Sequence, residues 1–206
     1  MAEPEQPQVY LISPPQIELS RFSDQLTQIL DAMPVACFRL ALTSTEEREI
    51  SQTADHLREA CHARDVAIVI EAHYRLVEKL GLDGCHLSDG AKNLQDVRKE
   101  LGSDAIIGSF CGTSKHTGMS AAEAGADYVS FGPVGASALG TGEVAEAELF
   151  TWWSEMIEVP VVAEGGLNAE RIETLAPITD FFGVGSEIWA PDDPLKSLQA
   201  LLAPLN

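Results

Sequence analysis

Two short segments near the C-terminal end of the sequence each combine an apolar run with glycine and a small polar residue. Residues 161–168 read VVAEGGLN, and residues 181–188 read FFGVGSEI. In each, a strand-like run ends in glycine just before a helical stretch, which leaves backbone N–H groups unpaired at the helix start. Such N–H groups are a ready site for phosphate. The pattern therefore predicts a site for a small phosphorylated molecule, formed by Gly165, Gly166, Gly185 and Ser186.

A second candidate for anion binding lies at the start of the helix expected over Ser114–Ala124. Lys115 and His116 occupy its first turn, where their side chains could add positive charge to the unpaired N–H groups of the helix start. The alternative is an ordinary solvated first turn with no part in chemistry.

Strand-like and helix-like segments alternate along the whole chain, and they must position these residues. The strands are expected over Val9–Ser13, Val35–Ala41, Val66–Glu71, Gly84–Leu87, Ala105–Ser109, Tyr128–Gly132, Val159–Ala163 and Asp180–Val184. The helices are expected over Glu18–Ala32, Thr45–Arg64, Tyr74–Leu80, Asn93–Leu101, Ser114–Ala124, Glu146–Ile157, Ala169–Leu175 and Pro194–Leu202. Continuous apolar strands are typical of parallel strands buried on both faces. Eight β-then-α units predict one (β/α)8 barrel domain over residues 1–206, with a doubly wound open sheet as the alternative.

A (β/α)8 barrel carries its functional side chains at the C-terminal ends of the strands, and the loops after the last two strands form a phosphate site. The two glycine segments fit this rule, although tight turns required by barrel closure would use the same residues. Applied to the remaining strand ends, the rule selects Ser13, Arg39, Glu71, His73, His86, Asp89, Ser109, Cys111, Ser137 and Glu164.

Composition narrows the classes of partner. The 206 residues are 45% hydrophobic and 22% charged, with 32 acidic against 13 basic side chains and a net charge of −19. A surface this acidic repels nucleic acid and anionic membranes. We therefore expect neither as a partner. The first eight residues are polar and acidic, and no apolar run reaches the ~18 residues of a membrane span. We expect a cytoplasmic protein.

The cysteines argue against two further kinds of site. Cys37, Cys61, Cys85 and Cys111 form no C-x-x-C pair, which disfavours a zinc site or a thioredoxin-like motif. In a cytoplasmic protein we expect them to be free thiols.

The order of the motifs resembles the thiamine phosphate synthase family over nearly the whole chain. It runs YLIS, FRL, GLDGCHLSD, IIGS, GADYVSFGPV, VPVVAEGGLN and GVGSEI, and GADYVSFGP and VVAEGGLN are the most specific pieces. The resemblance implies a (β/α)8 barrel enzyme that joins a hydroxymethylpyrimidine diphosphate to a thiazole phosphate and releases diphosphate. The same family includes thiazole tautomerases and diverged members.

The resemblance also implies roles for single residues. Arg39 matches an arginine that binds the pyrimidine diphosphate, and Gly165, Gly166 and Ser186 match the family's phosphate cup. His86 follows the family's fourth-strand pattern, although a histidine in a strand is also an ordinary structural residue. Ser137 stands where the family has one of its threonines. For Arg39 the alternative to ligand binding is an ion pair with Glu71 or Asp89.

The metal side of the family's site is altered in this chain. The positions of its two Mg²⁺-binding aspartates are Ala72 and Ala91 here. Glu71 and Asp89 lie within two residues of them and are candidates for a displaced Mg²⁺ site, because this ion needs only one or two carboxylates besides diphosphate oxygens. The alternative is that both are solvated loop carboxylates.

Three functions follow from these observations. The first is thiamine phosphate synthesis, in which Arg39, Lys115 and Mg²⁺ on Glu71 and Asp89 stabilise the departing diphosphate. The second is a catalytically degenerate barrel that binds a thiamine-related phosphate ester. The third is an isomerase-type reaction in the same cup, with Glu71 or His86 as the base. The sequence leaves a homo-oligomer open.

Overall fold

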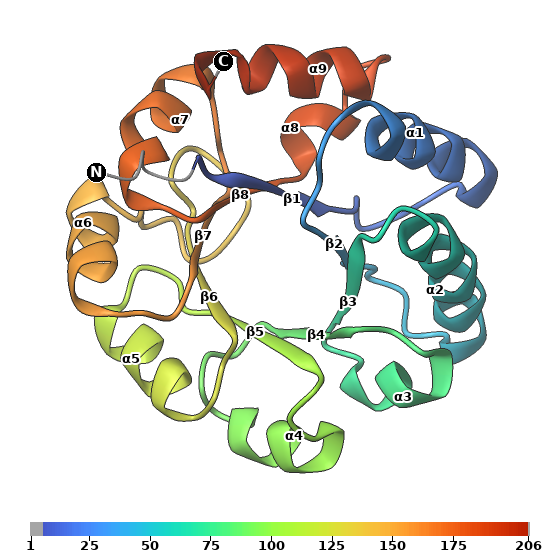
Figure 1. Ribbon diagram of the computed structural model, residues 1–206, viewed down its shortest axis with the longest axis horizontal. Helices are drawn as coiled ribbons and strands as arrows, with labels where there is room; N and C mark the ends of the chain where they lie inside the picture. The colour runs from blue at the N-terminus through green and yellow to red at the C-terminus, as the bar shows by residue number, and fades with distance from the viewer. Residues whose placement is uncertain (1–5, 206) are drawn as a thin grey trace.

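The strands of the computed structural model, which describes residues 6–205, close into a barrel (Figure 1). Every neighbouring pair is parallel, and β8 pairs with β1 through the register Tyr10 to Gly183. The (β/α)8 prediction is therefore confirmed, and the open sheet is excluded. The strands are β1 Gln8–Ile12, β2 Cys37–Leu40, β3 Ala67–Glu71, β4 Gly84–Leu87, β5 Ile106–Phe110, β6 Tyr128–Phe131, β7 Val161–Glu164 and β8 Phe181–Val184.

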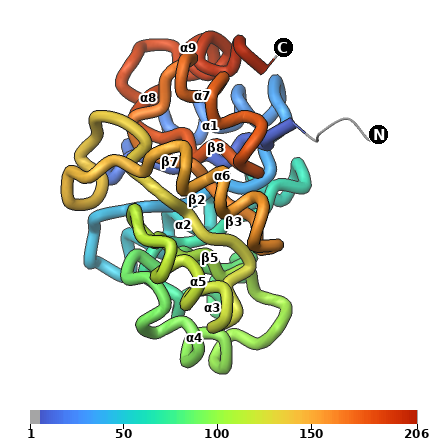
Figure 2. Tube along the Cα trace, turned by 90° about the vertical axis from the view of Figure 1, so that its left-hand side faces the viewer, coloured from blue at the N-terminus to red at the C-terminus, as the bar shows by residue number. Residues whose placement is uncertain are grey.

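Helices surround the barrel, as Figure 1 shows from one end and Figure 2 from the side. They are α1 Leu19–Ala32, α2 Glu47–His62, α3 Val77–Leu80, α4 Leu94–Leu101, α5 Lys115–Glu123, α6 Ala147–Met156, α7 Ala169–Leu175, α8 Ser186–Trp189 and α9 Pro194–Leu201. Three 3₁₀ turns are η1 Tyr74–Leu76, η2 Ala176–Ile178 and η3 Ala203–Leu205. The expected helix at Tyr74–Leu80 is thus a 3₁₀ turn followed by the short α3. Helix α8 was not predicted, because four residues are too few to show a helical period.

Side-chain caps fix where several of these helices begin. The Ser114 hydroxyl accepts a hydrogen bond from the Thr117 N–H at the start of α5. The Asn168 side chain accepts one from the Arg171 N–H at the start of α7. Each cap satisfies a backbone donor that the first helical turn leaves unpaired. Helices α5 and α7 follow β5 and β7, so these caps also shape the loops at the C-terminal end of the barrel.

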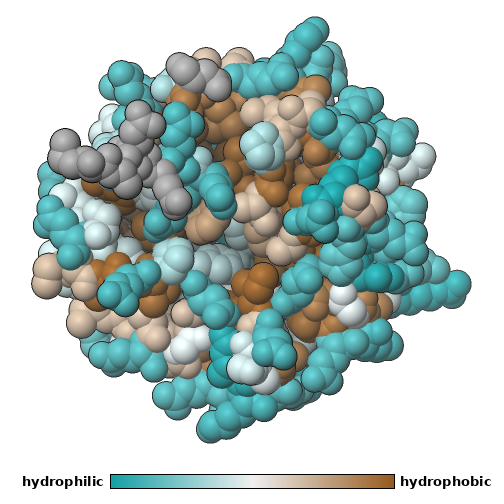
Figure 3. Space-filling view, in the orientation of Figure 1, coloured by the Kyte–Doolittle hydropathy of each residue, from teal (hydrophilic) through white to brown (hydrophobic). Residues whose placement is uncertain are grey.

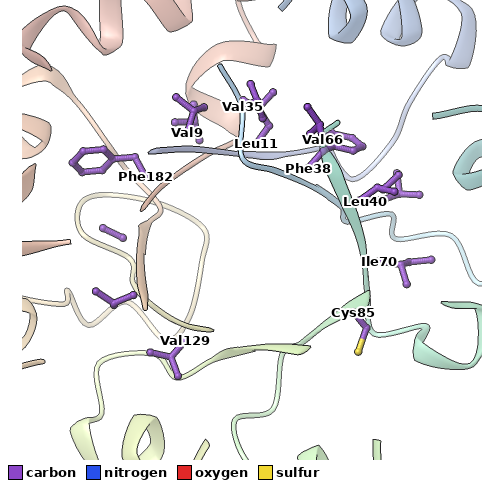
Figure 4. Close-up of a cluster of buried hydrophobic side chains, with 14 of the residues drawn as sticks. Val9, Leu11, Val35, Phe38, Leu40, Val66, Ile70, Cys85, Val129 and Phe182 are labelled. Carbon is purple, nitrogen blue, oxygen red and sulfur yellow. The ribbon is translucent and has the colours of Figure 1, made fainter. Parts of the chain in front are cut away.

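Two hydrophobic cores result from the alternation of side chains along each strand. The larger lies between barrel and helices, where Leu11, Phe38 and Ile70 point outward from their strands (Figure 4). The smaller lies inside the barrel and is formed by Tyr10, Cys37, Val69, Tyr128 and Val162. Two layers of this kind are the expected packing of a (β/α)8 barrel.

The cysteines are divided between these two cores. All four are buried and free of disulfide bonds. Cys37 belongs to the inner core, whereas Cys61, Cys85 and Cys111 belong to the outer one. The expectation of free thiols is confirmed.

The outer surface carries many hydrophilic residues, as the share of charged residues in the composition predicts. In Figure 3, hydrophilic residues cover the rim of one face and hydrophobic ones gather nearer its centre. No helix within residues 6–205 has both the length and the apolar character needed to cross a bilayer.

Candidate active site

A cavity of about 510 Å³ opens at the C-terminal ends of β1, β2, β7 and β8. Its wall contains seven of the residues predicted for the site: Ser13, Arg39, Ser137, Glu164, Gly165, Gly185 and Ser186. Ile12, Glu187 and Trp189 form much of the remaining wall. The cavity therefore joins the expected diphosphate side of the site to the expected phosphate cup.

Arg39 points into the barrel from β2 and is almost fully buried. Its two terminal nitrogens donate hydrogen bonds to the two carboxylate oxygens of Glu164 on β7. Its Nε lies 3.4 Å from Oε2 of Glu71 on β3. The ion-pair alternative is thus realised with Glu71, and with Glu164 rather than Asp89.

Burial and the neighbouring charges shift the pKa values of Arg39 and Glu71 in this cluster. Burial opposes a charged Arg39, but the carboxylates of Glu164 and Glu71 outweigh it and raise the pKa of Arg39 above its ordinary value. Burial raises the pKa of Glu71, an effect that Arg39 opposes and Glu164 reinforces. One guanidinium therefore serves two carboxylates in the mouth of the barrel.

A glycine on the neighbouring strand makes room for Glu164. A Cβ atom at Gly183 on β8 would lie 2.8 Å from the Cβ of Glu164, closer than real side chains approach. Sequence reasoning placed Glu164 at a strand end but assigned it no partner. The alternation of inward and outward positions, with Val162 inward, indicates that Glu164 faces the same interior as Arg39.

Below the Arg39 cluster, the barrel interior holds a chain of three hydrogen-bonding rings. The hydroxyls of Tyr10 and Tyr128 are 2.5 Å apart, and the Tyr128 hydroxyl is 3.0 Å from Nδ1 of His86. Gly108 on β5 leaves space for the Tyr128 ring, since a Cβ there would lie 1.9 Å from Cζ. His86 is only 1% exposed and is not among the residues that line the cavity. This arrangement agrees with the structural alternative for His86.

The burial of His86 has a consequence for stability at low pH. Burial, aided by Arg39, holds the pKa of His86 well below its ordinary value of 6.5. Below pH 6.5 the unfolded chain therefore binds a proton that the folded chain does not, so the stability associated with neutral His86 is lost as the pH falls. We expect His86→Gln to remove this contribution, which is at most about 1.4 kcal/mol per pH unit. Urea unfolding at pH 7.5, 6.5 and 5.5 measures the free energy of unfolding of the original protein and of His86→Gln. If this free energy changes equally with pH in both proteins, the prediction is wrong.

The two loops predicted to form the phosphate cup lie side by side, and backbone N–H groups from both donate to one internal carboxylate. The N–H groups of Gly166 and Leu167 donate to Oε1 of Glu187 at 2.9 and 3.1 Å. The N–H of Gly185 donates to Oε2 of the same side chain at 2.9 Å. Gly165 and Gly166 both have positive φ, +82° and +76°, which few residues other than glycine adopt. Sequence reasoning missed Glu187, although an acidic residue in the first turn of a helix is a recognised signal.

Lys115 and Asp89 lie apart from the cavity, and Glu71, His86 and Gly166 are likewise not among the described residues that line it. The Lys115 ammonium lies 4.8 Å from the centre of the Trp152 ring on α6, a cation–π contact on an exposed helix start. Asp89 is exposed and accepts a hydrogen bond from the Asn93 side chain at 2.8 Å. Neither is among the described residues that line the cavity.

The carboxylates expected to hold Mg²⁺ are engaged elsewhere. Glu71 pairs with Arg39, and Asp89 is held by Asn93. Within residues 6–205, no three His, Cys, Asp or Glu side chains are grouped so that they could hold a metal ion. These side chains therefore do not fit a metal ion on their own, and we assign no chemical step to one.

Comparison with known proteins shows the family to which this barrel belongs. The sequence model of the family described as thiamine monophosphate synthase matches residues 9–185. The chain belongs to the thiamine monophosphate synthase family. Its curated relatives include the thiamine-phosphate synthase of Rhodospirillum centenum, 38% identical over 185 residues that cover 88% of each chain. That of Erythrobacter litoralis is 36% identical over 200 residues, which cover 94% of this chain and 93% of the relative.

Solved structures agree on the fold of this thiamine monophosphate synthase family member. The thiamine phosphate pyrophosphorylase of Pyrococcus furiosus superposes with a TM-score of 0.81 over 96% of this chain and 95% of its own. The two are 21% identical. A 3-hexulose-6-phosphate synthase from Salmonella typhimurium superposes with a TM-score of 0.72 at 16% identity, over 96% of this chain and 98% of its own. Both likenesses support the barrel.

Proposed function

We propose that this chain is a thiamine phosphate synthase, which joins a hydroxymethylpyrimidine diphosphate to a thiazole phosphate and releases diphosphate. One observation carries the proposal. In a member of this family, the N–H groups of Gly166, Leu167 and Gly185 converge on the Glu187 carboxylate. Glu187 and Gly185 line the same cavity as Arg39. Such a cavity suits a reaction in which both partners bring phosphate groups.

The chemistry divides the wall into two parts. In the reaction, the bond between the pyrimidine methylene and the diphosphate oxygen breaks, and its electron pair leaves with diphosphate. The thiazole nitrogen then forms a bond to that methylene carbon. Arg39 would stabilise the departing anion, while Glu71 and Glu164 would stabilise positive charge that develops on the methylene. Gly165, Gly166, Gly185, Ser186 and the Ser137 hydroxyl would hold the thiazole phosphate.

The pairing of Arg39 supports a second candidate. A guanidinium already neutralised by Glu164 and Glu71 attracts diphosphate less strongly than an unpaired one. A barrel of this kind could retain the cup and bind a thiamine-related phosphate ester without forming the new bond.

An assay of the purified protein separates the two candidates. The protein is incubated with the pyrimidine diphosphate, the thiazole phosphate and added Mg²⁺, and thiamine phosphate and diphosphate are quantified. Formation of both in equal amounts supports synthesis, with omission of the pyrimidine as the control. Calorimetric binding of the thiazole phosphate without product favours the binding protein. If the thiazole phosphate does not bind and no product forms, both candidates are wrong.

The proposal extends to the setting of the protein. We place the reaction in the cytoplasm, with small phosphorylated molecules as substrates and one barrel domain over residues 1–206 as the working unit. Whether that unit acts alone or as a homo-oligomer is measurable by light scattering during the same assay.

A further inference from the structure

We propose that Glu187 is an internal competitor of the substrate phosphate, and that it sets how strongly and how selectively the cup binds a phosphate ester. The inference rests on the proposed function, because it concerns the same cup. It adds a residue that determines specificity.

The contacts of Glu187 are those that a bound anion would make. Its two carboxylate oxygens accept hydrogen bonds of 2.9 to 3.1 Å from three backbone donors. The donors come from two loops: Gly166 and Leu167 follow β7, whereas Gly185 follows β8. Hydrogen bonds to a charged acceptor are stronger than those between neutral groups. The cup thus holds a complete anion before any substrate arrives.

These three donors cannot serve Glu187 and a phosphate at once. Each backbone N–H has a single proton to donate, and all three are directed at the carboxylate. A phosphate placed beside the remaining carboxylate would also meet like-charge repulsion. A phosphate ester therefore binds through these N–H groups only when the Glu187 side chain leaves them.

The position of Glu187 makes such an exchange feasible. It stands on the first turn of the four-residue helix α8, two residues after Gly185, and its side chain is only partly buried. It also lines the cavity together with Gly185 and Ser186, so it can turn toward solvent without unfolding a core element. Displacement costs the cup three hydrogen bonds, which phosphate then replaces.

This competition also changes selectivity. A substrate without phosphate, such as the thiazole alcohol, has no anion to place on the three N–H groups and leaves Glu187 where it is. Removal of the carboxylate should therefore strengthen binding of the phosphate ester and leave the alcohol unaffected.

The test compares Glu187→Ala with the original protein by calorimetry, using inorganic phosphate and, separately, the thiazole alcohol. We expect phosphate to bind at least about tenfold more tightly to the variant, the equivalent of one charge-assisted hydrogen bond. The affinity for the alcohol should not change. Glu187→Gln keeps an acceptor without the charge and should give an intermediate gain, and it carries the test if the alanine variant does not fold.

Glu173→Ala is the matched control, because it removes one acidic charge from α7 at an exposed position and should leave both affinities unchanged. If Glu187→Ala binds phosphate no more tightly than the original protein, the competitor role is wrong, while thiamine phosphate formation still decides the proposed function. An equal gain in Glu173→Ala would also overturn the competitor role, because it would assign the effect to net charge. If no variant binds phosphate, the cup is not a phosphate site and the inference is wrong, even where the assay detects product.

Discussion

Replacing Arg39 with methionine is expected to destabilise the protein by about 3–5 kcal/mol, the usual effect of removing one partner from a buried ion pair. The reason is the state in which the substitution leaves Glu164. This carboxylate is 1% exposed, and its two oxygens accept hydrogen bonds from Arg39. Without the guanidinium, a buried carboxylate is left without its partner. Urea unfolding near pH 7 measures the loss.

Two comparisons make this result specific. A double variant with methionine at positions 39 and 164 removes both members of the fully buried pair and leaves Glu71, whose side chain is 33% exposed and can be solvated. It should recover most of the stability, because an apolar pair of similar volume often replaces a buried ion pair without loss. Arg64→Met removes the exposed ion pair with Asp31 and should cost less than about 1 kcal/mol. If Arg39→Met costs no more than Arg64→Met, water must reach the cluster and the pair is not a buried one.

The second large effect is expected at Gly166. Its φ is +76°, and a Cβ atom there would lie 2.6 Å from the backbone carbon of Gly135. Gly166→Ala keeps the N–H that we assign to the thiazole phosphate, but the clash must move it. A shift of about 1 Å in a positioning group costs roughly 100-fold in rate. We therefore expect kcat/KM for thiamine phosphate formation to fall by about that factor or more.

A glycine elsewhere in the fold supplies the control for this substitution. Gly102, after α4, also has positive φ, +81°, but nothing lies within 4 Å of a Cβ built there. Gly102→Ala should therefore also carry backbone strain from its positive φ, without a clash, and leave kcat/KM unchanged. If both variants lose activity equally, loss of stability explains the result, and the role of Gly166 in the cup is wrong.

Most of the fold could be predicted because strands and long helices leave a pattern of apolar residues in short stretches of sequence. Apolar runs such as 66–71 and 159–163 carry the signal of buried parallel strands, and the observed strands differ from the expected ones by one or two residues at most ends. Helix α8 lay beyond this reasoning, because one turn of helix is fixed by its tertiary position and not by a repeating pattern.

The site was harder to predict, because its main features are pairings between distant residues. Arg39 and Glu164 are 125 positions apart, and Tyr10 and Tyr128 are 118 apart. A strand end shows that a side chain reaches the barrel mouth, but not which side chain it meets there. The glycines proposed for the cup were selected from a local sequence pattern. The occupant of the cup, Glu187, was missed, although it is only two residues from Gly185.

The reactivity of the four buried cysteines can report where the structure opens locally. Burial raises the pKa of Cys37, Cys61 and Cys85 to about 12 and that of Cys111 to about 11. Because alkylating reagents attack the thiolate, none of these thiols should react until the chain around it opens. Cys37 faces the interior of the barrel, while the other three lie in the core between the barrel and the helices. The order in which mass spectrometry finds the four cysteines modified would therefore distinguish the detachment of a helix from the opening of the β-barrel.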